Sequence, residues 1–483
     1  MQSQRDHVLS VVEERGVRLV QLWFTDVLGT PKSFNITPAE LEHALDEGMT
    51  FDGSSIDGFS RVHESDVLAR PDASTFQVLP WKSRPPARGG SALDEPSAAT
   101  GAVGRLFCDV CNLDGTPFEG DPRHVLRRAL AAARRKGFSC YAAPELEFFY
   151  FASADLDETG RRAGGASGGG ATLTSPGRSL HNGLRLLDTG SYFELTVADV
   201  ADELRRETVL TLEEMGMPVE YAQHEDAPSQ HEIDLRHIDA LTMADTVMTA
   251  RLVVKEIAQR HGVHATFMPK PLEGVQGSGM HTHFSLFEGD TNAFFDPGDA
   301  YGLSAVAKGF IAGLLAHAPA ITAVTNQWVN SYKRLVRGYE APVHVSWARN
   351  NRSALVRVPL ARRGRPDSTR VEYRSPDPAC NPYLAFALVI AAGLDGIESR
   401  LELPPEAAAN LYALSPVELA AEGIASLPES LAEALEAMES SELVAATLGE
   451  HVFEWFLRNK RAEWADYATH VSSFELERYL ARL

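Results

Sequence analysis

The spacing of hydrophobic residues changes from helical to strand-like near the N-terminus. Apolar residues recur at helical spacing in MQSQRDHVLSVVEERG (1–16), whereas VRLVQLWFTDV (17–27) has the dense apolar content of a strand. A turn at LGTPKS (28–33) and further short apolar runs such as TFQVLPW (75–81) follow. This order predicts a small N-terminal α/β unit over residues 1–115.

A second unit is predicted to begin with a helix. The segment EGDPRHVLRRALAAARRKG (119–137) places Asp121 at the capping position and a proline at the first helical position. We therefore expect a second domain over residues 116–483, with a helical tail beyond residue 430. Residues 160–178, GRRAGGASGGGATLTSPGR, contain too little apolar surface to pack and are predicted to form a flexible surface insertion.

Charge and composition narrow the class of protein. Among 483 residues, 45 Lys and Arg stand against 66 Asp and Glu, which gives a formal charge of -21 and argues against nucleic acid as a partner. No secretory signal is visible, and the longest apolar stretch, YLAFALVIAAGL (383–394), is too short to span a bilayer. We therefore expect a cytoplasmic protein that does not bind membranes. The single C-x-x-C, Cys108 and Cys111, favours strand packing over a zinc site.

Ionisable residues recur at every second position in three strand-like segments. They are Glu145 and Glu147 in APELEFFYF (143–151), His281 and His283 in GSGMHTHFSL (277–286), and Arg370, Glu372 and Arg374 in STRVEYRSPDP (368–378). Alternation in a strand places such side chains on one face. Because carboxylates at this spacing repel each other, a bound cation is the simplest explanation. For the two histidines alone, a polar strand face is an equally good interpretation.

Further acidic and basic residues extend this pattern. EYAQHEDAPSQHEID (220–234) adds Glu225 and Glu232, and glutamates with one histidine suit Mg²⁺ or Mn²⁺. The basic segments NSYKRLVRGYEAP (330–342) and WARNNRSALVRVP (347–359) could hold phosphate and carboxylate oxygens. Since no G-x-x-x-x-G-K-[ST] motif occurs, this combination indicates phosphoryl transfer by electrostatic positioning. From the histidines and carboxylates alone, a metal-dependent hydrolase is an alternative.

Seven segments resemble, in order and spacing, the motifs of bacterial type I glutamine synthetases. They are FDGSS (51–55), PELEFF (144–149), HEDAPSQHEID (224–234), FMPKPLEGVQGSGMHTHFSL (267–286), NSYKRLVRGYEAP (330–342), NRSALVRVP (351–359) and RVEYRSPDPACNPYLAFALVIAAGLDG (370–396). The resemblance implies an α+β fold with an N-terminal β-grasp domain and a catalytic domain. In the latter, a curved antiparallel sheet flanked by helices forms a funnel for ATP and glutamate. It also implies a homo-oligomer, a dodecamer of two hexameric rings with shared active sites.

The resemblance assigns roles residue by residue. It implies that Glu147, Glu225 and Glu232 bind one divalent ion, Mg²⁺ or Mn²⁺, and that Glu145, His281 and Glu372 bind another, with two or three ions per subunit. The residues that it implies for binding glutamate, ammonium and the transferred phosphate are Gln276, Gly277, Arg334, Arg352, Arg374, Tyr192 and Asp66. Those that it implies for binding ATP are Glu220, His283, Ser285, Arg357 and Arg370. Asp52 resembles the aspartate that takes a proton from ammonium, and Glu340 resembles the flap residue that shields the intermediate.

The activity that the resemblance implies is ATP-dependent ligation of ammonia to the γ-carboxylate of L-glutamate through γ-glutamyl phosphate. Three departures concern the amine: Gln276 replaces the usual Asn, Arg337 replaces the usual flap Pro, and YFELTVAD (192–199) lacks a proline pair. Relatives with similar changes act as γ-glutamyl ligases for polyamines or other amines, so this class is an alternative, as is a catalytically silent homologue. Tyr412 aligns with the tyrosine that is adenylylated in some members.

Overall fold

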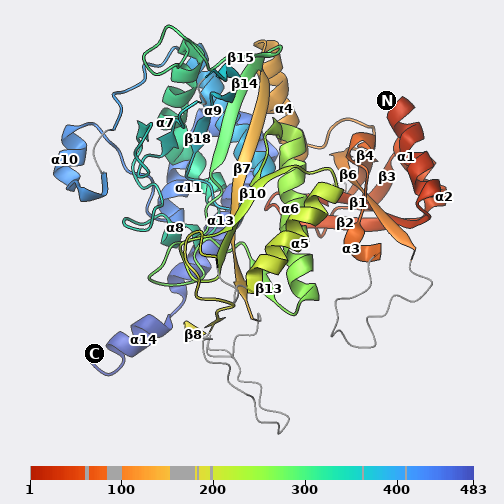
Figure 1. The fold of residues 1–483 in the computed structure, drawn as a ribbon, viewed down its shortest axis with the longest axis horizontal. Coiled ribbons are helices and arrows are strands. Elements are labelled where there is room, and N and C mark those ends of the chain that lie inside the picture. The colour runs from red at the N-terminus through yellow and green to blue at the C-terminus, as the bar shows by residue number, and fades with distance from the viewer. Residues whose placement is uncertain are drawn as a thin grey trace.

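The computed structural model of the chain describes residues 2–59, 65–83, 101–152, 180–181, 184–195, 200–361, 364–407 and 411–483. The predicted glycine-rich insertion, 160–178, lies outside the described residues. Two mixed arrangements of helices and strands make up the described chain, as the α+β prediction requires (Figure 1).

The N-terminal unit is a six-stranded sheet with strand order β2-β1-β6-β4-β3, and β5 pairs with β6. Its strands are β1 (Val17–Thr25), β2 (Pro31–Ile36), β3 (Met49–Asp52), β4 (Asp66–Pro71), β5 (Gln77–Val78) and β6 (Ala102–Cys111), and its helices are α1 (Gln2–Glu14), α2 (Pro38–Asp46) and α3 (Pro80–Ser83). The two central strands, β1 and β6, run parallel. Apolar side chains of β1 and β6 pack under α1 and α2, and Cys108 and Cys111 are buried free thiols of β6.

The second unit is built around a ten-stranded sheet with strand order β10-β11-β7-β14-β18-β17-β16. Its strands are β7 (Ser139–Phe151), β10 (Val219–His224), β11 (Gln230–Leu235), β12 (Ile238–Asp239), β13 (His264–Thr266), β14 (Thr282–Glu288), β15 (Thr291–Asn292), β16 (Trp347–Ala348), β17 (Val356–Arg357) and β18 (Val371–Tyr373). β8 (Leu180–His181) and β9 (Leu184–Arg185) form a separate pair. Within the ten-stranded sheet, all described pairings are antiparallel except β16 with β17.

Helices cover the sheet and fill the core of the second unit (Figure 1). They are α4 (Pro122–Arg135), α5 (Val200–Glu214), α6 (Ala240–Arg260), α7 (Ala305–Thr325), α8 (Ser331–Arg334), α9 (Pro382–Glu398), α10 (Pro416–Ala421), α11 (Leu431–Glu439), α12 (Glu442–Leu448), α13 (Glu450–Thr469) and α14 (Ser473–Tyr479). The predicted cap of α4 is confirmed, since the Asp121 side chain accepts a hydrogen bond from the Arg123 amide. The predicted helical tail is also confirmed.

Helices α7 and α9 are the most apolar long elements. They approach closely because Gly313 faces α9, where an added Cβ would lie 2.1 Å from the Ala392 carbonyl oxygen. By length and composition α7 could span a membrane, a possibility that the sequence analysis did not consider, but 61% of its most apolar window is buried inside the protein. The apolar stretch 383–394 lies in α9, where nearly every residue is buried. Both helices thus have the burial of core helices.

A buried arginine joins the two units. Arg123 of α4 is 3% exposed, and its guanidinium lies 2.9 Å from an Asp245 oxygen of α6, 2.5 Å from Asp109 of β6 and 2.9 Å from Asp72 of the N-terminal unit. Arg127, one helical turn later, contacts the same Asp72 and Asp109, but its side chain is 38% exposed. Of these two arginines, Arg123 therefore is the one that forms an ion pair with the buried Asp245 carboxylate on α6.

We predict that Arg123→Met destabilises the protein much more than Arg127→Met. Removing Arg123 leaves Asp245 buried without its ionic partner, which costs about 3 kcal/mol or more, whereas an exposed pair contributes less than about 1 kcal/mol. Thermal unfolding followed by differential scanning calorimetry measures both variants. Equal midpoint losses in the two variants would contradict this interpretation.

Candidate active site

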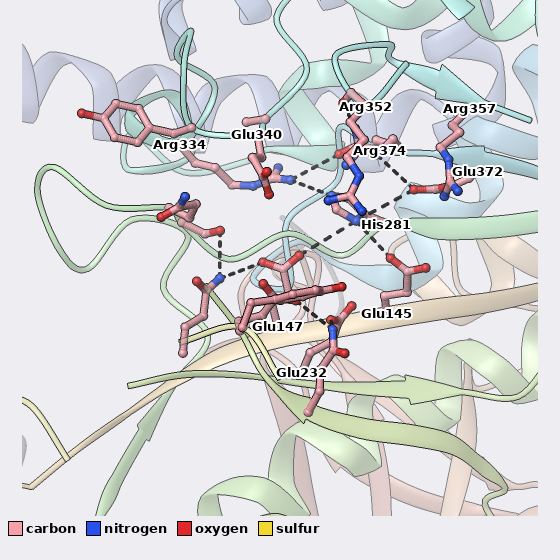
Figure 2. A pocket seen from close by; sticks show the side chains of 18 of the residues that line it. Glu145, Glu147, Glu232, His281, Arg334, Glu340, Arg352, Arg357, Glu372 and Arg374 are labelled. Atoms are coloured by element: carbon pink, nitrogen blue, oxygen red, sulfur yellow. Dashed lines mark hydrogen bonds and ion pairs between the residues drawn. The ribbon is translucent and has the colours of Figure 1, made fainter. Parts of the chain in front are cut away.

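Four neighbouring strands form the acidic floor of a cavity of about 260 Å³ (Figure 2). The sheet register places Glu147 of β7 opposite Glu232 of β11, and Glu372 of β18 opposite His283 of β14. Because β7 lies between β11 and β14, side chains on one face of these strands converge although they are far apart in sequence. The ionisable residues that recur at every second position in the sequence therefore lie together on one surface of the sheet.

The two histidines of the segment GSGMHTHFSL (277–286), His281 and His283, both contact Glu145. His281 Nδ1 lies 3.0 Å from Glu145 Oε2, and His283 Nε2 lies 2.7 Å from Glu145 Oε1. Arg370 donates its Nε hydrogen to His283 Nδ1 at 3.3 Å, so the remaining ring proton of neutral His283 lies on the nitrogen that faces Glu145. Because a ring nitrogen that carries a proton cannot bind a cation, His281 is the better candidate for a metal ligand.

Carboxylates of the floor fall into two electrostatic classes. Burial raises the pKa of Glu147, as does nearby Glu225. Burial also raises the pKa of Glu232 well above its ordinary value, and the charge of Asp234 adds to this effect. The pKa of Glu145 lies well below its ordinary value because hydrogen bonds from His281 and His283 outweigh burial. Glu147 and Glu232 thus bind protons more readily than ordinary glutamates do, whereas Glu145 keeps its negative charge more readily.

The same floor offers ligands of the kind that hard divalent cations prefer. One ligand atom each of Glu145, His281 and Glu372 lies within 4.8 Å of the others. Glu147, Glu225 and Glu232 line the same cavity. Oxygen donors with a single imidazole suit Mg²⁺ or Mn²⁺, and the pKa values of Glu147 and Glu232 are raised by burial and by neighbouring carboxylates, whose charge a bound cation would offset. The donor set therefore fits the predicted ions.

Two glutamines support the carboxylates and were missed by the sequence analysis. Gln230 donates from Nε2 to Glu147 Oε2 at 2.9 Å. Gln223 donates from its Nε2 to Glu225 Oε1 at 2.9 Å and also to Glu232. For Gln230, the sequence did contain a signal, because Gln230, Glu232 and Asp234 occupy every second position of β11.

A second cluster that was missed lies behind the floor. His224 Nε2 lies 2.7 Å from Asp188 Oδ1, and His224 Nδ1 lies 2.6 Å from the Glu225 carbonyl oxygen. His231 Nδ1 lies 2.8 Å from the Arg205 guanidinium, which can only donate, and burial lowers the pKa of His231 to about 4. The proton of neutral His231 therefore lies on Nε2, facing Asp188 at 3.3 Å, and blocks a metal there. The cluster instead fixes the backbone at Glu225.

Arginines line the opposite side of the cavity (Figure 2). Arg334 is 2% exposed and donates to the Ser375 carbonyl at 2.7 Å. Arg374 and Arg357 each contact a different oxygen of Glu372, at 3.0 and 2.6 Å. Burial and the charge of Glu145 raise the pKa of Glu372, but the charges of His283, Arg374 and His281 outweigh them, so the net pKa of Glu372 is lowered. Arg352 completes the basic side.

A second cavity of about 410 Å³ shares Glu145 and Tyr221 with the first. It contains four of the residues predicted to contact ATP, namely Glu220, His283, Ser285 and Arg370. The fifth, Arg357, lines the first cavity. Asp234, also in the second cavity, has its pKa raised to about 8 by burial and by the charge of Glu145. The predicted nucleotide residues are therefore split between two adjoining spaces.

The predicted glutamate and flap residues lie at the mouth of the first cavity. Tyr192, Gln276, Gly277 and Glu340 all line it, and the Gln276 amide donates to Asp226. Tyr192 is 44% exposed, so the side of the cavity that it lines is open to solvent. These positions agree with a substrate entrance above the acidic floor.

Asp52 and Asp66 lie apart from both cavities. They are exposed register partners on β3 and β4 of the N-terminal unit. The Ser54 amide donates to Asp52 Oδ1 at 2.8 Å, and this bond lowers the pKa of Asp52. Within one copy of the chain, the structure thus brings together the residues predicted to bind metal, phosphate and nucleotide, with Tyr192, but not Asp52 and Asp66, which are predicted to act on ammonium.

Comparisons with known proteins agree with this geometry. The family models described as "Glutamine synthetase, beta-Grasp domain" and "Glutamine synthetase, catalytic domain" match residues 16–112 and 119–479. Proteins named glutamine synthetase from Mycolicibacterium smegmatis and Mycobacterium tuberculosis are 53% and 52% identical over 481 residues, with 100% of each chain covered.

A solved structure titled "GmaS/ADP complex-Conformation 1" has a TM-score of 0.80 at 31% identity, covering 98% of this chain and 99% of that chain. The predicted β-grasp and catalytic domains are thereby confirmed as the fold of both units. The chain belongs to the glutamine synthetase family.

Proposed function

We propose that the protein joins ammonia to the γ-carboxylate of L-glutamate with hydrolysis of ATP, giving glutamine, ADP and phosphate. The observation that carries this proposal is the acidic floor facing a row of arginines in one cavity, beside a second cavity lined by four of the residues predicted to contact ATP. The proposal is supported by the sequence identity of 53% and 52% to two proteins named glutamine synthetase over the full chain. The protein is a ligase of this type.

The chain's own residues account for the activation step. A divalent cation held by Glu145, His281 and Glu372, and another held by Glu147, Glu225 and Glu232, would neutralise the charge of phosphate oxygens. Arg334, Arg352 and Arg374 hold the glutamate and the transferred phosphate in place. The γ-carboxylate then attacks phosphorus, ADP leaves, and γ-glutamyl phosphate supplies the leaving group that a bare carboxylate lacks.

The amine step needs residues at the cavity mouth and from the N-terminal unit. Ammonium must lose a proton before it can attack the acyl carbon, and Asp52, helped by Asp66, is the base in our proposal. Glu340 covers the acyl phosphate and accepts a further proton, while Tyr192 forms a wall for the ammonium ion. The location of Asp52 outside the cavities of its own chain supports a site shared with a neighbouring subunit.

A γ-glutamyl ligase for another amine is the second candidate. Gln276, whose amide bonds Asp226 at the cavity mouth, and the exposed Tyr192 are the observations in its favour. The greater identity to proteins named glutamine synthetase than to GmaS favours ammonia.

We predict that phosphate release with ATP and glutamate depends on ammonium. Replacing ammonium by methylamine, ethanolamine, putrescine or spermidine should lower kcat/KM by about 100-fold or more, because an added alkyl group must fit a pocket built for a small cation. Phosphate release and product mass report the amine used. A larger kcat/KM for any of these amines would establish the second candidate instead.

We predict that divalent cations bind more tightly as the pH rises. The pKa values of Glu147 and Glu232 are raised, so protons compete with the cation at these carboxylates, and the competition weakens as pH rises through the raised values. Titration calorimetry with Mn²⁺, in two buffers of different ionisation enthalpy, should show proton release. Glu232→Gln should lower both the affinity and the number of protons released; a pH-independent affinity would contradict the arrangement.

We propose a cytoplasmic dodecamer of two hexameric rings. The C-terminal segment supports association, since α14 extends away from the rest of the chain (Figure 1) and its Phe474, Leu476 and Tyr479 are 61%, 48% and 44% exposed. Such apolar exposure is typical of a contact surface. Light scattering coupled to gel filtration should give a mass about twelve times the 52.7 kDa of one chain. A monomeric, fully active enzyme would exclude the shared site.

A further inference from the structure

The loop that carries Glu340 has a strained backbone. Glu340 has φ +61°, a left-handed conformation that is uncommon for a residue with a side chain, and Gly338, two residues earlier, has φ +89°. Tyr339, Glu340 and Ala341 line the first cavity. A strained conformation persists only where surrounding contacts determine it, so the contacts of this loop decide where the Glu340 carboxylate lies.

Two hydrogen bonds hold this loop on either side of Glu340. The Tyr412 hydroxyl donates to the Ala341 carbonyl oxygen at 2.7 Å, and Arg337 Nη1 donates to the Leu414 carbonyl oxygen at 3.3 Å. Both bonds reach the same short turn, Leu411–Ala413 and the residue after it. The two bonds thus connect the loop to one anchor at two points.

The anchor is itself fixed in the protein. Leu411 is fully buried and packs with Ala407 and Leu419 in a small apolar cluster. Ala341 is 2% exposed, so its carbonyl lies beside a buried residue, where a lost hydrogen bond is costly. On the other side of the loop, the Lys270 ammonium lies 4.2 Å from the centre of the Tyr339 ring.

We propose that Tyr412 and Arg337 are positioning residues that hold Glu340 over the cavity and thereby keep water from the acyl phosphate. The inference rests on the proposed function. Without the two bonds the loop opens more often, and a water oxygen can attack the γ-carbonyl carbon. The bond from that carbon to the phosphate oxygen then breaks, phosphate leaves, a proton passes to solvent, and glutamate is regenerated.

One of the two bonds depends on the Arg337 side chain. A proline, which type I glutamine synthetases usually carry at this flap position, has no side-chain donor and could not reach the Leu414 carbonyl. Lysine keeps a donor at the end of a long side chain, whereas methionine keeps the length without the donor. This pair of substitutions separates the hydrogen bond from packing.

The test compares phosphate released with glutamine formed at limiting ammonium. Wild type should give one phosphate for each glutamine, whereas Tyr412→Phe and Arg337→Met should each raise hydrolysis relative to ligation by about two- to tenfold, the effect expected from one lost hydrogen bond. Arg337→Lys should restore most of the coupling. Tyr467→Phe, which removes an exposed hydroxyl from α13, is the matched control and should leave the ratio at its wild-type value.

Hydrogen exchange of residues 337–341 gives a readout that does not depend on catalysis. Exchange in this loop should be faster in Tyr412→Phe and Arg337→Met than in wild type and in Tyr467→Phe. If neither exchange nor the phosphate ratio changes, or if kcat falls while the ratio keeps its wild-type value, the inference is overturned. If wild type forms no glutamine from ATP, glutamate and ammonium, the proposed function fails, and exchange alone then decides whether the two bonds hold the loop.

Discussion

Electrostatic repulsion among buried carboxylates is the constraint on which the site depends. Glu145, Glu147, Glu232 and Glu372 share one face of adjoining strands, at separations where each charge disfavours the next. The protein reduces this cost with histidine protons, glutamine amides and arginines, yet part of the floor keeps raised pKa values. Such a surface is poised to bind cations, because a cation removes both the protons and the repulsion.

The rest of the fold can be understood as support for that surface. A long central strand, β7, pairs on both sides so that ligands from four strands converge, and backbone hydrogen bonds of the sheet prevent them from moving apart. Helices α7 and α9 pack against each other through glycines in the core of the same unit. Arg123 then joins this unit to the N-terminal sheet by a buried ion-pair network. Rigidity at the floor contrasts with the loop around Glu340, which a few hydrogen bonds hold.

In our proposal, the position of the N-terminal unit makes the amine step depend on assembly. Asp52 and Asp66 are exposed and far enough from both cavities that neither lines them, although their motif is part of the family resemblance. In the proposed function, a base supplied by a second subunit would couple the amine step to oligomerisation, whereas the residues predicted to bind metal and nucleotide line two adjoining cavities of one chain. On this proposal, activation of glutamate and capture of the amine would be separable.

The sequence by itself predicted several elements, among them the first helix, β1 and α4, and most of the acidic and basic side chains that line the two cavities. Alternation at period two identified Glu145, Glu147, His281 and Glu372, because a strand presents every second side chain to one face. Only the tertiary structure decided which strands are neighbours, which of the two histidines also contacts Arg370, and that Gln223 and Gln230 bridge the carboxylates. These features depend on pairings between segments that are distant in sequence, and local periodicity carries no information about such pairings.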